Sequence, residues 1–248
     1  MRLTGRTALV TGSTSNIGRA IALAFAAEGA HVLVSGRSQE RGDAVAAEIR
    51  AAGGKADFAA ADLGTAQGAR DLAAEATRVL GHVDILVNNA GLIDGAPTGQ
   101  VADDVFDALF AVNVKAPIFL VGALAPAMAE RGGGVVVNLG SWVARLGIPV
   151  GVAYAASKGA VETLTKAWAA EYGPRGVRVN AISPGVVHEQ GENHPAAGMM
   201  AGTPAGVPGE PEAIARAAVY LASDDAAFVH GITLDVDGGR QHVAVLAG

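Results

Sequence analysis

The sequence contains no cysteine, which excludes disulfide bonds and thiolate metal sites. It has no block of basic residues and a formal net charge of -6 at pH 7, which argues against nucleic acid as the main partner. No run of about 18 apolar residues passes without a polar or charged break. The most apolar stretch, 117–129, is bounded by Lys115 and Glu130. We interpret this stretch as a buried helix and expect no membrane partner.

What is present favours a globular protein with a sizeable core. Half of the 248 residues are hydrophobic, and this length suits one large domain or two small ones. The first seven residues lack the apolar segment and cleavage site of a signal peptide, so we expect a cytoplasmic protein. No shift in composition and no internal repeat marks a boundary. We therefore expect one domain over residues 1–248.

Short apolar segments alternate with helical segments along the chain, which favours parallel βαβ units. We expect a doubly wound α/β sheet of about seven strands, a Rossmann fold with helices on both faces. A Gly/Pro-rich loop at about 186–209 is the one long irregular segment, and loops of this length are usually lids, binding loops or disorder. The expected strands are 7–10, 31–35, 55–60, 83–87, 134–139, 177–182 and 232–236, and the expected helices are 17–28, 38–52, 65–80, 101–131, 152–172 and 211–222.

The stretch 11–18, Thr-Gly-Ser-Thr-Ser-Asn-Ile-Gly, lies between the first expected strand and the first helix. In a Rossmann unit such a turn lets the backbone approach a dinucleotide pyrophosphate at the helix N-terminus. Asn16 stands where a glycine is expected, and asparagine tolerates a left-handed backbone. The alternative is an ordinary turn into a helix, but the strand-turn-helix context favours nucleotide binding. The predicted cofactor contacts here are Gly12, Ser13, Thr14, Ser15, Asn16, Ile17 and Gly18.

The second expected strand ends at Ser35-Gly36-Arg37-Ser38. An acidic residue at this point would bind the ribose diol and repel a 2′-phosphate. Gly36 and Arg37 offer no carboxylate and one fixed cation, which favours NADP(H) over NAD(H). The alternative is a solvated arginine at the start of a helix.

Tyr154 and Lys158 are four residues apart in an expected helix, so their side chains share one face. A cation at roughly 5 Å, with an effective dielectric constant of about 20, favours the phenolate by about 3 kcal/mol. That is a little over two pKa units at ~1.36 kcal/mol per unit. Taken alone, the pair is a common chance match, and a tyrosine in an alanine-rich helix usually serves packing. In context, it predicts a proton donor and acceptor that works near neutral pH.

Together these motifs resemble the short-chain dehydrogenase/reductase family, in its short single-domain, 3-oxoacyl reductase-like form. The match covers nearly the whole chain, and the order and spacing of the motifs are specific, including thirteen residues from Ser141 to Tyr154. The residues that carry the resemblance are Thr11-Gly12 to Gly18, Asp62, Asn88-Asn89-Ala90-Gly91, Asn113, Ser141, Tyr154, Lys158, Pro184-Gly185 and Asp237-Gly238-Gly239.

The resemblance implies four catalytic residues. Tyr154 would be the acid/base, and Lys158 would bind the nicotinamide ribose and lower the pKa of the tyrosine. Ser141 would hold the substrate oxygen, and Asn113 would organise a water chain behind Lys158. The chemistry agrees, because two hydroxyl groups converging on a carbonyl oxygen stabilise the negative charge that hydride transfer develops there.

The resemblance also implies further cofactor contacts, and the residues suggest a substrate pocket. Asp62 and Leu63 would contact the adenine, Asn89, Ala90 and Gly91 would lie along the cofactor, and Pro184, Gly185 and Val187 would flank the nicotinamide. Trp142, Val143, Arg145 and His188 are candidate substrate-pocket residues, with surface charge and core packing as the alternatives.

The segment 188–194 departs from the family pattern. Glu189 stands where members often have a threonine that contacts the nicotinamide amide. The two histidines and two carboxylates of this segment could in principle bind a divalent metal. Such residues are more often polar lid residues, so we expect no metal.

We therefore expect an NAD(P)(H)-dependent oxidoreductase acting on a ketone or secondary alcohol, with NADP(H) preferred. A dinucleotide-binding sensor or scaffold without turnover is the alternative, and it has no need of all four catalytic groups. A 3-oxoacyl substrate on a carrier protein would use Arg131 and Arg175 as phosphate contacts. The resemblance also implies a homotetramer or homodimer that buries the long helices.

Overall fold

The structure is a computed structural model that describes residues 1–149, 151–188 and 197–244. Within these residues, seven parallel strands form one sheet in the order β3-β2-β1-β4-β5-β6-β7. The predicted doubly wound α/β fold is confirmed, and the strand bounds agree with the prediction within two residues. The strands are β1 Thr7–Val10, β2 His31–Gly36, β3 Lys55–Ala60, β4 Ile85–Asn88, β5 Gly134–Leu139, β6 Val177–Pro184 and β7 Thr233–Val236.

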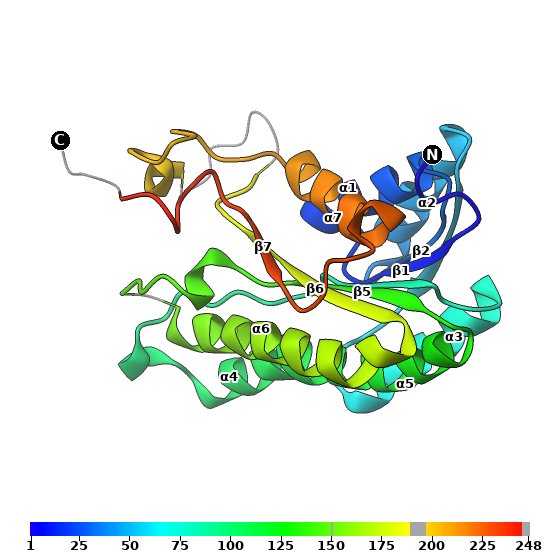
Figure 1. Ribbon diagram of the computed structural model, residues 1–248. Coiled ribbons are helices and arrows are strands. Elements are labelled where there is room, and N and C mark those ends of the chain that lie inside the picture. Colours follow the sequence, from blue (N-terminus) through cyan, green and yellow to red (C-terminus); the bar gives the residue numbers. More distant parts are fainter. Residues whose placement is uncertain (150, 189–196, 245–248) are drawn as a thin grey trace.

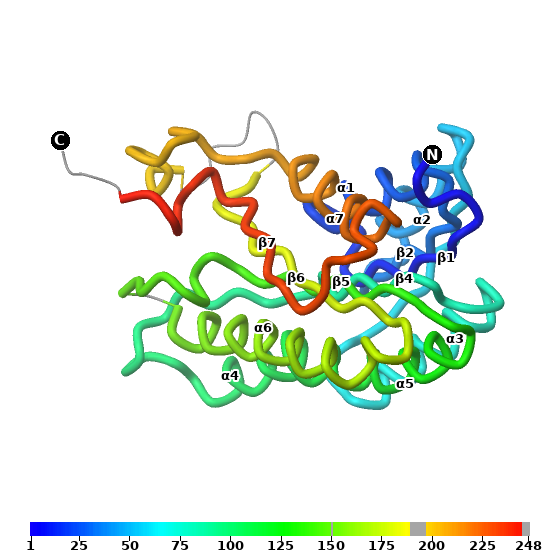
Figure 2. Tube along the Cα trace, in the orientation of Figure 1, coloured from blue at the N-terminus to red at the C-terminus, as the bar shows by residue number. Residues whose placement is uncertain are grey.

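Helices cover both faces of the sheet, as Figures 1 and 2 show. One layer contains α1, α2 and α7, and the opposite layer contains α3, α4, α5 and α6. The helices are α1 Asn16–Ala27, α2 Gln39–Ala51, α3 Ala66–Leu80, α4 Asp103–Phe110, α5 Ala116–Glu130, α6 Val152–Tyr172 and α7 Pro211–Ala222. Short 3₁₀ turns lie at Thr98–Gln100, Trp142–Ala144, Gly173–Arg175, Ala197–Met200 and Asp224–Ala226.

The central strands β1, β4 and β5 are mostly apolar because both of their faces are buried. Successive strand residues point to opposite faces, so Val10 packs in the core under α1 and α7 while its neighbour Leu9 packs in the core with α3 and α5. Val34 and Leu33 of β2 divide in the same way. This explains the continuous apolar runs, which are typical of buried parallel strands.

The predicted helix 101–131 is interrupted in the structure. A π-helical turn, Ala111–Lys115, separates α4 from α5. Pro117 in the first turn of α5 has no N–H to donate to the carbonyl of Asn113, which favours a local widening of the helix. Asp103–Glu130 is long and apolar enough to cross a membrane by length and composition, but half of its apolar window is buried. Because α5 packs against α3 and the sheet, it is a core helix of this fold.

The strand order reverses at β1, which has β2 on one side and β4 on the other. In doubly wound sheets, ligands bind at the carboxyl ends of the strands beside such a switch point. The loops that follow β1 to β6 carry most of the predicted site residues to this edge, and α6 and the π-helical turn contribute Tyr154, Lys158 and Asn113.

Candidate active site

The turn after β1 has the backbone geometry that a dinucleotide cradle needs. Gly12 has a φ of 61°, and a Cβ there would lie 2.8 Å from the Cα of Ala90. Asn16 has a φ of 46° and is the one non-glycine residue with a positive φ in the described parts of the chain. The prediction that asparagine replaces a glycine in a left-handed conformation is therefore confirmed.

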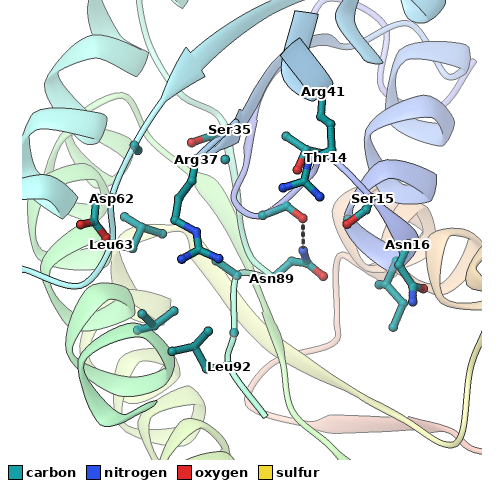
Figure 3. Close-up of a pocket in the computed structure, with 18 of the residues that line it drawn as sticks. Thr14, Ser15, Asn16, Ser35, Arg37, Arg41, Asp62, Leu63, Asn89 and Leu92 are labelled. Atoms are coloured by element: carbon teal, nitrogen blue, oxygen red, sulfur yellow. Dashed lines mark hydrogen bonds between the residues drawn. The ribbon is translucent and has the colours of Figure 1, made fainter. Parts of the chain in front are cut away.

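Hydrogen bonds join this turn to the loop after β4. The side-chain amide of Asn89 donates to the carbonyl oxygens of Thr11 and Gly12, at 2.8 Å and 2.9 Å. Figure 3 draws one hydrogen bond of this amide as a dashed line. The Thr11 hydroxyl accepts from the backbone N–H groups of Asn89 and Ala90. Thr11 and Asn89 thus set the spacing between the two loops that form the floor of a cleft.

The cleft has a volume of about 430 Å³. It collects predicted cofactor contacts from the four loops that follow β1, β2, β3 and β4, together with several residues that were not predicted. Ser13 is an exception: it is fully buried, donates to the Val10 carbonyl and accepts from the Ser35 N–H, so its hydroxyl joins β1 to β2. The predicted residues that line the cleft are Gly12, Thr14, Ser15, Asn16, Ile17, Gly18, Arg37, Asp62, Leu63, Asn89, Ala90 and Gly91, and the unpredicted ones include Ser35, Arg41, Leu92 and Ile93.

Two arginines lie at the end of this cleft beside Gly36. Arg37 follows β2 and Arg41 lies in the first turn of α2, and both side chains extend into the space that Thr14 and Ser35 border (Figure 3). Both are exposed, and no carboxylate pairs with either guanidinium among the described residues. A glycine turn at the floor of the cleft, with the two arginines at its end, is compatible with a dinucleotide that carries an additional phosphate.

A second cavity, of about 400 Å³, continues from the cleft and shares Asn16, Ile17, Asn89 and Gly91 with it. It brings together Ser141 after β5, Tyr154 and Lys158 on α6, and the end of β6. Trp142 and Val143 line it as predicted, as do Pro184, Gly185 and Val187. The hydroxyl, phenol and ammonium groups therefore line one cavity, beside the residues predicted to flank the nicotinamide.

Burial governs the protonation of the central pair. Lys158 is buried, and its Nζ donates to the Leu139 carbonyl at 2.8 Å. Burial lowers the pKa of Lys158 to about 8. Burial raises the pKa of Tyr154, and the side-chain hydrogen bond with Ser141 acts in the opposite direction.

The expected lowering of the Tyr154 pKa by Lys158 is not seen in the protein alone. The lysine Nζ lies 5.8 Å from the centroid of the tyrosine ring and is directed to the Leu139 carbonyl. Desolvation of the phenol therefore dominates the pKa of Tyr154 in this arrangement, and the hydrogen bond with Ser141 only partly offsets it.

Asn113 lies in the π-helical turn and binds the loop after β4. Its Oδ1 accepts from the Leu92 N–H at 2.7 Å, and its Nδ2 donates to the Leu92 carbonyl and to the Ser157 hydroxyl. A Cβ on Gly91 would lie 3.3 Å from Asn113 Oδ1 and 3.6 Å from Lys158 Nζ. Asn113 and Lys158 therefore both lie next to Gly91, and the water chain that the resemblance implies stays a prediction.

Two predicted substrate-pocket residues lie elsewhere. Arg145 does not line the cavity, because its guanidinium is held by Glu162 of α6 and Asp235 of β7. His188 is not among the residues that line the cavity either. Glu189 and the rest of the segment 188–194 after His188 lie outside the described residues. In the parts of the chain that the structure describes, no cluster of acidic and histidine residues could hold a metal ion.

The predicted phosphate contacts for a carrier-bound substrate, Arg131 and Arg175, lie away from the cavity of the same chain. Arg131 donates to the Val83 carbonyl and Arg175 stacks on Tyr172. Both lie at the amino ends of the strands, near the starts of β5 and β6, whereas the cavity opens at their carboxyl ends.

Sequence reasoning missed several lining residues. Arg41 could have been found, because it lies four residues after Arg37 in the first turn of a helix capped by Ser38. Asp94, the one carboxylate among the described residues that line the catalytic cavity, follows Gly91 closely in sequence. Ile148 and Met199 come from irregular segments and left no such signal.

Comparisons with known proteins agree with this geometry. The family model described as short chain dehydrogenase matches residues 6–195. The D-threitol dehydrogenase of Mycolicibacterium smegmatis is 38% identical over 96% of this chain and 94% of its own. The 3-oxoacyl-[acyl-carrier-protein] reductase of Thermotoga maritima is 34% identical over 96% of this chain and 99% of its own.

A solved structure extends the likeness to the cofactor. The crystal structure of a gluconate 5-dehydrogenase from Burkholderia cenocepacia in complex with NADP and tartrate superposes with a TM-score of 0.91. The two proteins are 34% identical, and the match covers 98% of each chain. The chain therefore belongs to the short-chain dehydrogenase/reductase family and is an NAD(P)-dependent oxidoreductase.

Proposed function

We propose that the protein interconverts a ketone and a secondary alcohol, prefers NADP(H) to NAD(H), and uses Tyr154 as its acid/base. The observation that carries the proposal is the continuity of the two cavities. Arg37 and Arg41 lie at one end, and Ser141, Tyr154 and Lys158 meet at the other. A sensor or scaffold would have no need of this convergence.

The chemistry follows from the groups that meet there. When bound, the nicotinamide supplies or accepts the hydride. The phenol of Tyr154 donates its proton to the carbonyl oxygen during reduction and removes it from the alcohol during oxidation. The Ser141 hydroxyl donates a hydrogen bond to the same oxygen, which stabilises the negative charge that develops on it.

Lys158 contributes as a cation close to this point. Its Nζ lies near Gly91 and the Asn89 loop, on the cofactor side of the cavity. With a pKa of about 8 it remains mostly protonated at neutral pH. An ammonium there favours the phenolate over the phenol and can bind a ribose hydroxyl.

The cavity wall supports hydroxylated substrates. Trp142, Val143 and Ile148 form an apolar side, while Asp94 presents a carboxylate that can accept hydrogen bonds from substrate hydroxyl groups. The relatives named for threitol and gluconate act on polyhydroxylated compounds. A panel of small hydroxyketones and the corresponding polyols is therefore the first set to test.

The test follows NADPH oxidation with this panel, and NADP⁺ reduction with the alcohols, in the wild type and in Tyr154→Phe. We expect the substitution to reduce kcat at least ~10²-fold, because general acid-base catalysis typically contributes 10²–10⁴-fold. NADPH affinity and the melting temperature should change little. Equal rates in the two proteins would refute the mechanism, and an absence of turnover across the panel together with tight NADPH binding would favour the sensor.

A further inference from the structure

A cluster of ion pairs lies behind the catalytic cavity, at the segment that connects Ser141 to α6. Arg145 lies in this segment, four residues after Ser141. Its Nε donates to Oε1 of Glu162 at 3.2 Å, and its Nη1 donates to Oδ2 of Asp235 at 3.1 Å. Its Nη2 donates to the other oxygen of Asp235. One guanidinium group thus joins the Ser141 segment to both α6 and β7.

The carboxylate of Glu162 has a direct relation to the catalytic residues. Tyr154, Lys158 and Glu162 are spaced four residues apart on α6, so they follow one another along the same face. Only 7% of Glu162 is exposed, and a Cβ on Gly140, the neighbour of Ser141, would lie 3.5 Å from its Oε1. Burial raises the pKa of Glu162 while Arg145 acts to lower it. A buried carboxylate needs such a partner, so the two residues fix each other.

Asp235 connects the cluster to the other walls of the cavity. It also accepts from Nε2 of Gln241 at 2.9 Å and contacts Nε2 of His242 at 2.6 Å. The same Gln241 amide donates to the hydroxyl of Ser183, the residue before Pro184. The neighbouring Arg240 lies over the ring of Trp142, 5.2 Å from its centroid. The segment 240–242 is therefore attached to the cluster and to two walls of the cavity.

We propose that Arg145, held between Glu162 and Asp235, is a positioning residue that keeps the Ser141 hydroxyl against the Tyr154 phenol. Arg145 itself does not line the cavity, so it acts through Ser141 and not by touching substrate. The inference rests on the proposed function, which assigns Tyr154 as the acid/base.

The consequence can be measured on Tyr154. Burial raises the pKa of this phenol, and the hydrogen bond with Ser141 is the interaction that opposes it in the protein alone. If the Ser141 segment shifts, the opposing hydrogen bond is lost and the Tyr154 pKa rises further. Among the described residues, Ser141 and Lys158 face Tyr154, and Asp94 is the carboxylate that lines the same cavity.

The charged groups around Arg145 do not face Tyr154 directly. They are Glu162, Asp235, and behind them His242 and Lys166. If the net charge of this cluster is kept constant, a change at Arg145 can alter the Tyr154 pKa only by moving Ser141. Neutralising Arg145 and Glu162 together keeps the net charge constant, because one positive and one negative charge are removed.

The experiment uses Arg145→Met/Glu162→Gln, which removes one positive and one negative charge and leaves Asp235 with Gln241 and His242 as its partners. Arg145→Lys is the conservative variant, Ser141→Ala is the positive control, and Arg216→Met removes an exposed arginine of α7 as the matched control. The Tyr154 pKa is read from tyrosinate absorbance in the NADP⁺ complex, as the difference between each protein and its Tyr154→Phe counterpart. The chain contains only three tyrosines, which makes this difference measurable.

We expect the Tyr154 pKa to rise by about 0.5–1 unit in the double variant and in Ser141→Ala, which lowers the tyrosinate fraction roughly 3–10-fold at a given pH. The acid limb of kcat for alcohol oxidation should move to higher pH by the same amount, with KM nearly unchanged. Arg145→Lys should lie between the double variant and the wild type, and Arg216→Met should match the wild type.

An unchanged Tyr154 pKa in the double variant, with a lowered melting temperature, would overturn the proposal and leave the cluster a purely structural role. An unchanged pKa in Ser141→Ala would overturn it as well, because the hydroxyl would then not act on the phenol. The titration needs no turnover, so it still decides this inference if no substrate is found and the proposed function fails.

Discussion

The cofactor cleft and the catalytic cavity lie side by side at one edge of the sheet, but different interactions hold them in shape. The cleft is built from backbone: the Gly12 turn, the left-handed Asn16 and the Thr11–Asn89 hydrogen bonds form its floor. The cavity is built from buried side chains whose partners are distant in sequence. Lys158 binds the Leu139 carbonyl, and Asn113 binds the backbone of Leu92. Glu162 binds Arg145.

This difference separates two kinds of sensitivity. A backbone cradle fails when a side chain is added where none fits, whereas a buried polar cluster fails when a partner is removed. Substitutions that add one methyl group to a glycine should therefore disturb the cleft. Substitutions that remove a buried titratable group should change the pH dependence of the cavity.

The largest effect should come from Gly12→Ala. The new Cβ would meet the Ala90 backbone at 2.8 Å, and the residue would have to keep a φ of 61°. Strain and overpacking together should cost about 2–4 kcal/mol of folding free energy. A displaced turn should also weaken NADPH binding at least ~10-fold, which corresponds to ~1.4 kcal/mol. Urea unfolding and fluorescence titration with NADPH measure the two losses.

Gly53→Ala is the matched control for this substitution. Gly53 also has a positive φ, 84°, but nothing lies within 4 Å of its added Cβ. It should cost only about 1 kcal/mol through backbone strain and leave NADPH binding intact. Equal losses of stability and of NADPH affinity in the two variants would show that backbone strain, and not contact with the loop after β4, causes the effect of Gly12→Ala.

A smaller effect is expected from the protonation of Lys158. The folded protein releases this proton near pH 8, while an unfolded lysine holds it to about pH 10.5. The unfolded state therefore binds more protons in this window, so the folded state gains stability as the pH rises. Between pH 7.5 and 9.5, the gain should be about 2 kcal/mol at ~1.36 kcal/mol per pKa unit.

The gain is measured as the difference in urea unfolding free energy between the wild type and Lys158→Met, which lacks the titrating group. The raised pKa of Tyr154 keeps the phenol protonated in this range, so it should not mask the effect. A difference that stays constant from pH 7.5 to 9.5 would mean that Lys158 is not desolvated as the structure indicates.

The cleft was more predictable from sequence than the cavity, for a physical reason. The cradle is local: a strand, a turn with Gly12, Asn16 and Gly18, and a helix follow one another directly. The same holds for the end of β2, where Arg37 could be predicted. Ser13 was misplaced because its hydroxyl turns inward to Val10, which depends on the packing of β1 beside β2.

In the cavity, it could be predicted that Ser141, Tyr154 and Lys158 lie together, but not their electrostatics. The spacing of Tyr154 and Lys158 predicted their common face, yet the orientation of the ammonium depends on the Leu139 carbonyl of β5. Arg145 was misassigned for the same reason. Its partners, Glu162 and Asp235, come from α6 and β7, and only the folded chain brings them together.

The smallest effect should distinguish the two arginines of the cleft. Arg37→Ala should weaken NADPH binding about 10-fold and NADH binding little, because a hydrogen bond to a charged phosphate contributes about 1.5–3 kcal/mol. Arg41→Ala should weaken NADPH binding about 3-fold, since exposed charge pairs contribute ~0.2–1 kcal/mol. Lys55→Ala, which removes an exposed cation at the amino end of β3, is the control. Equal losses of NADPH and NADH affinity in Arg37→Ala would refute the NADP(H) preference. The backbone contacts of the cleft would then account for its selectivity without the arginine.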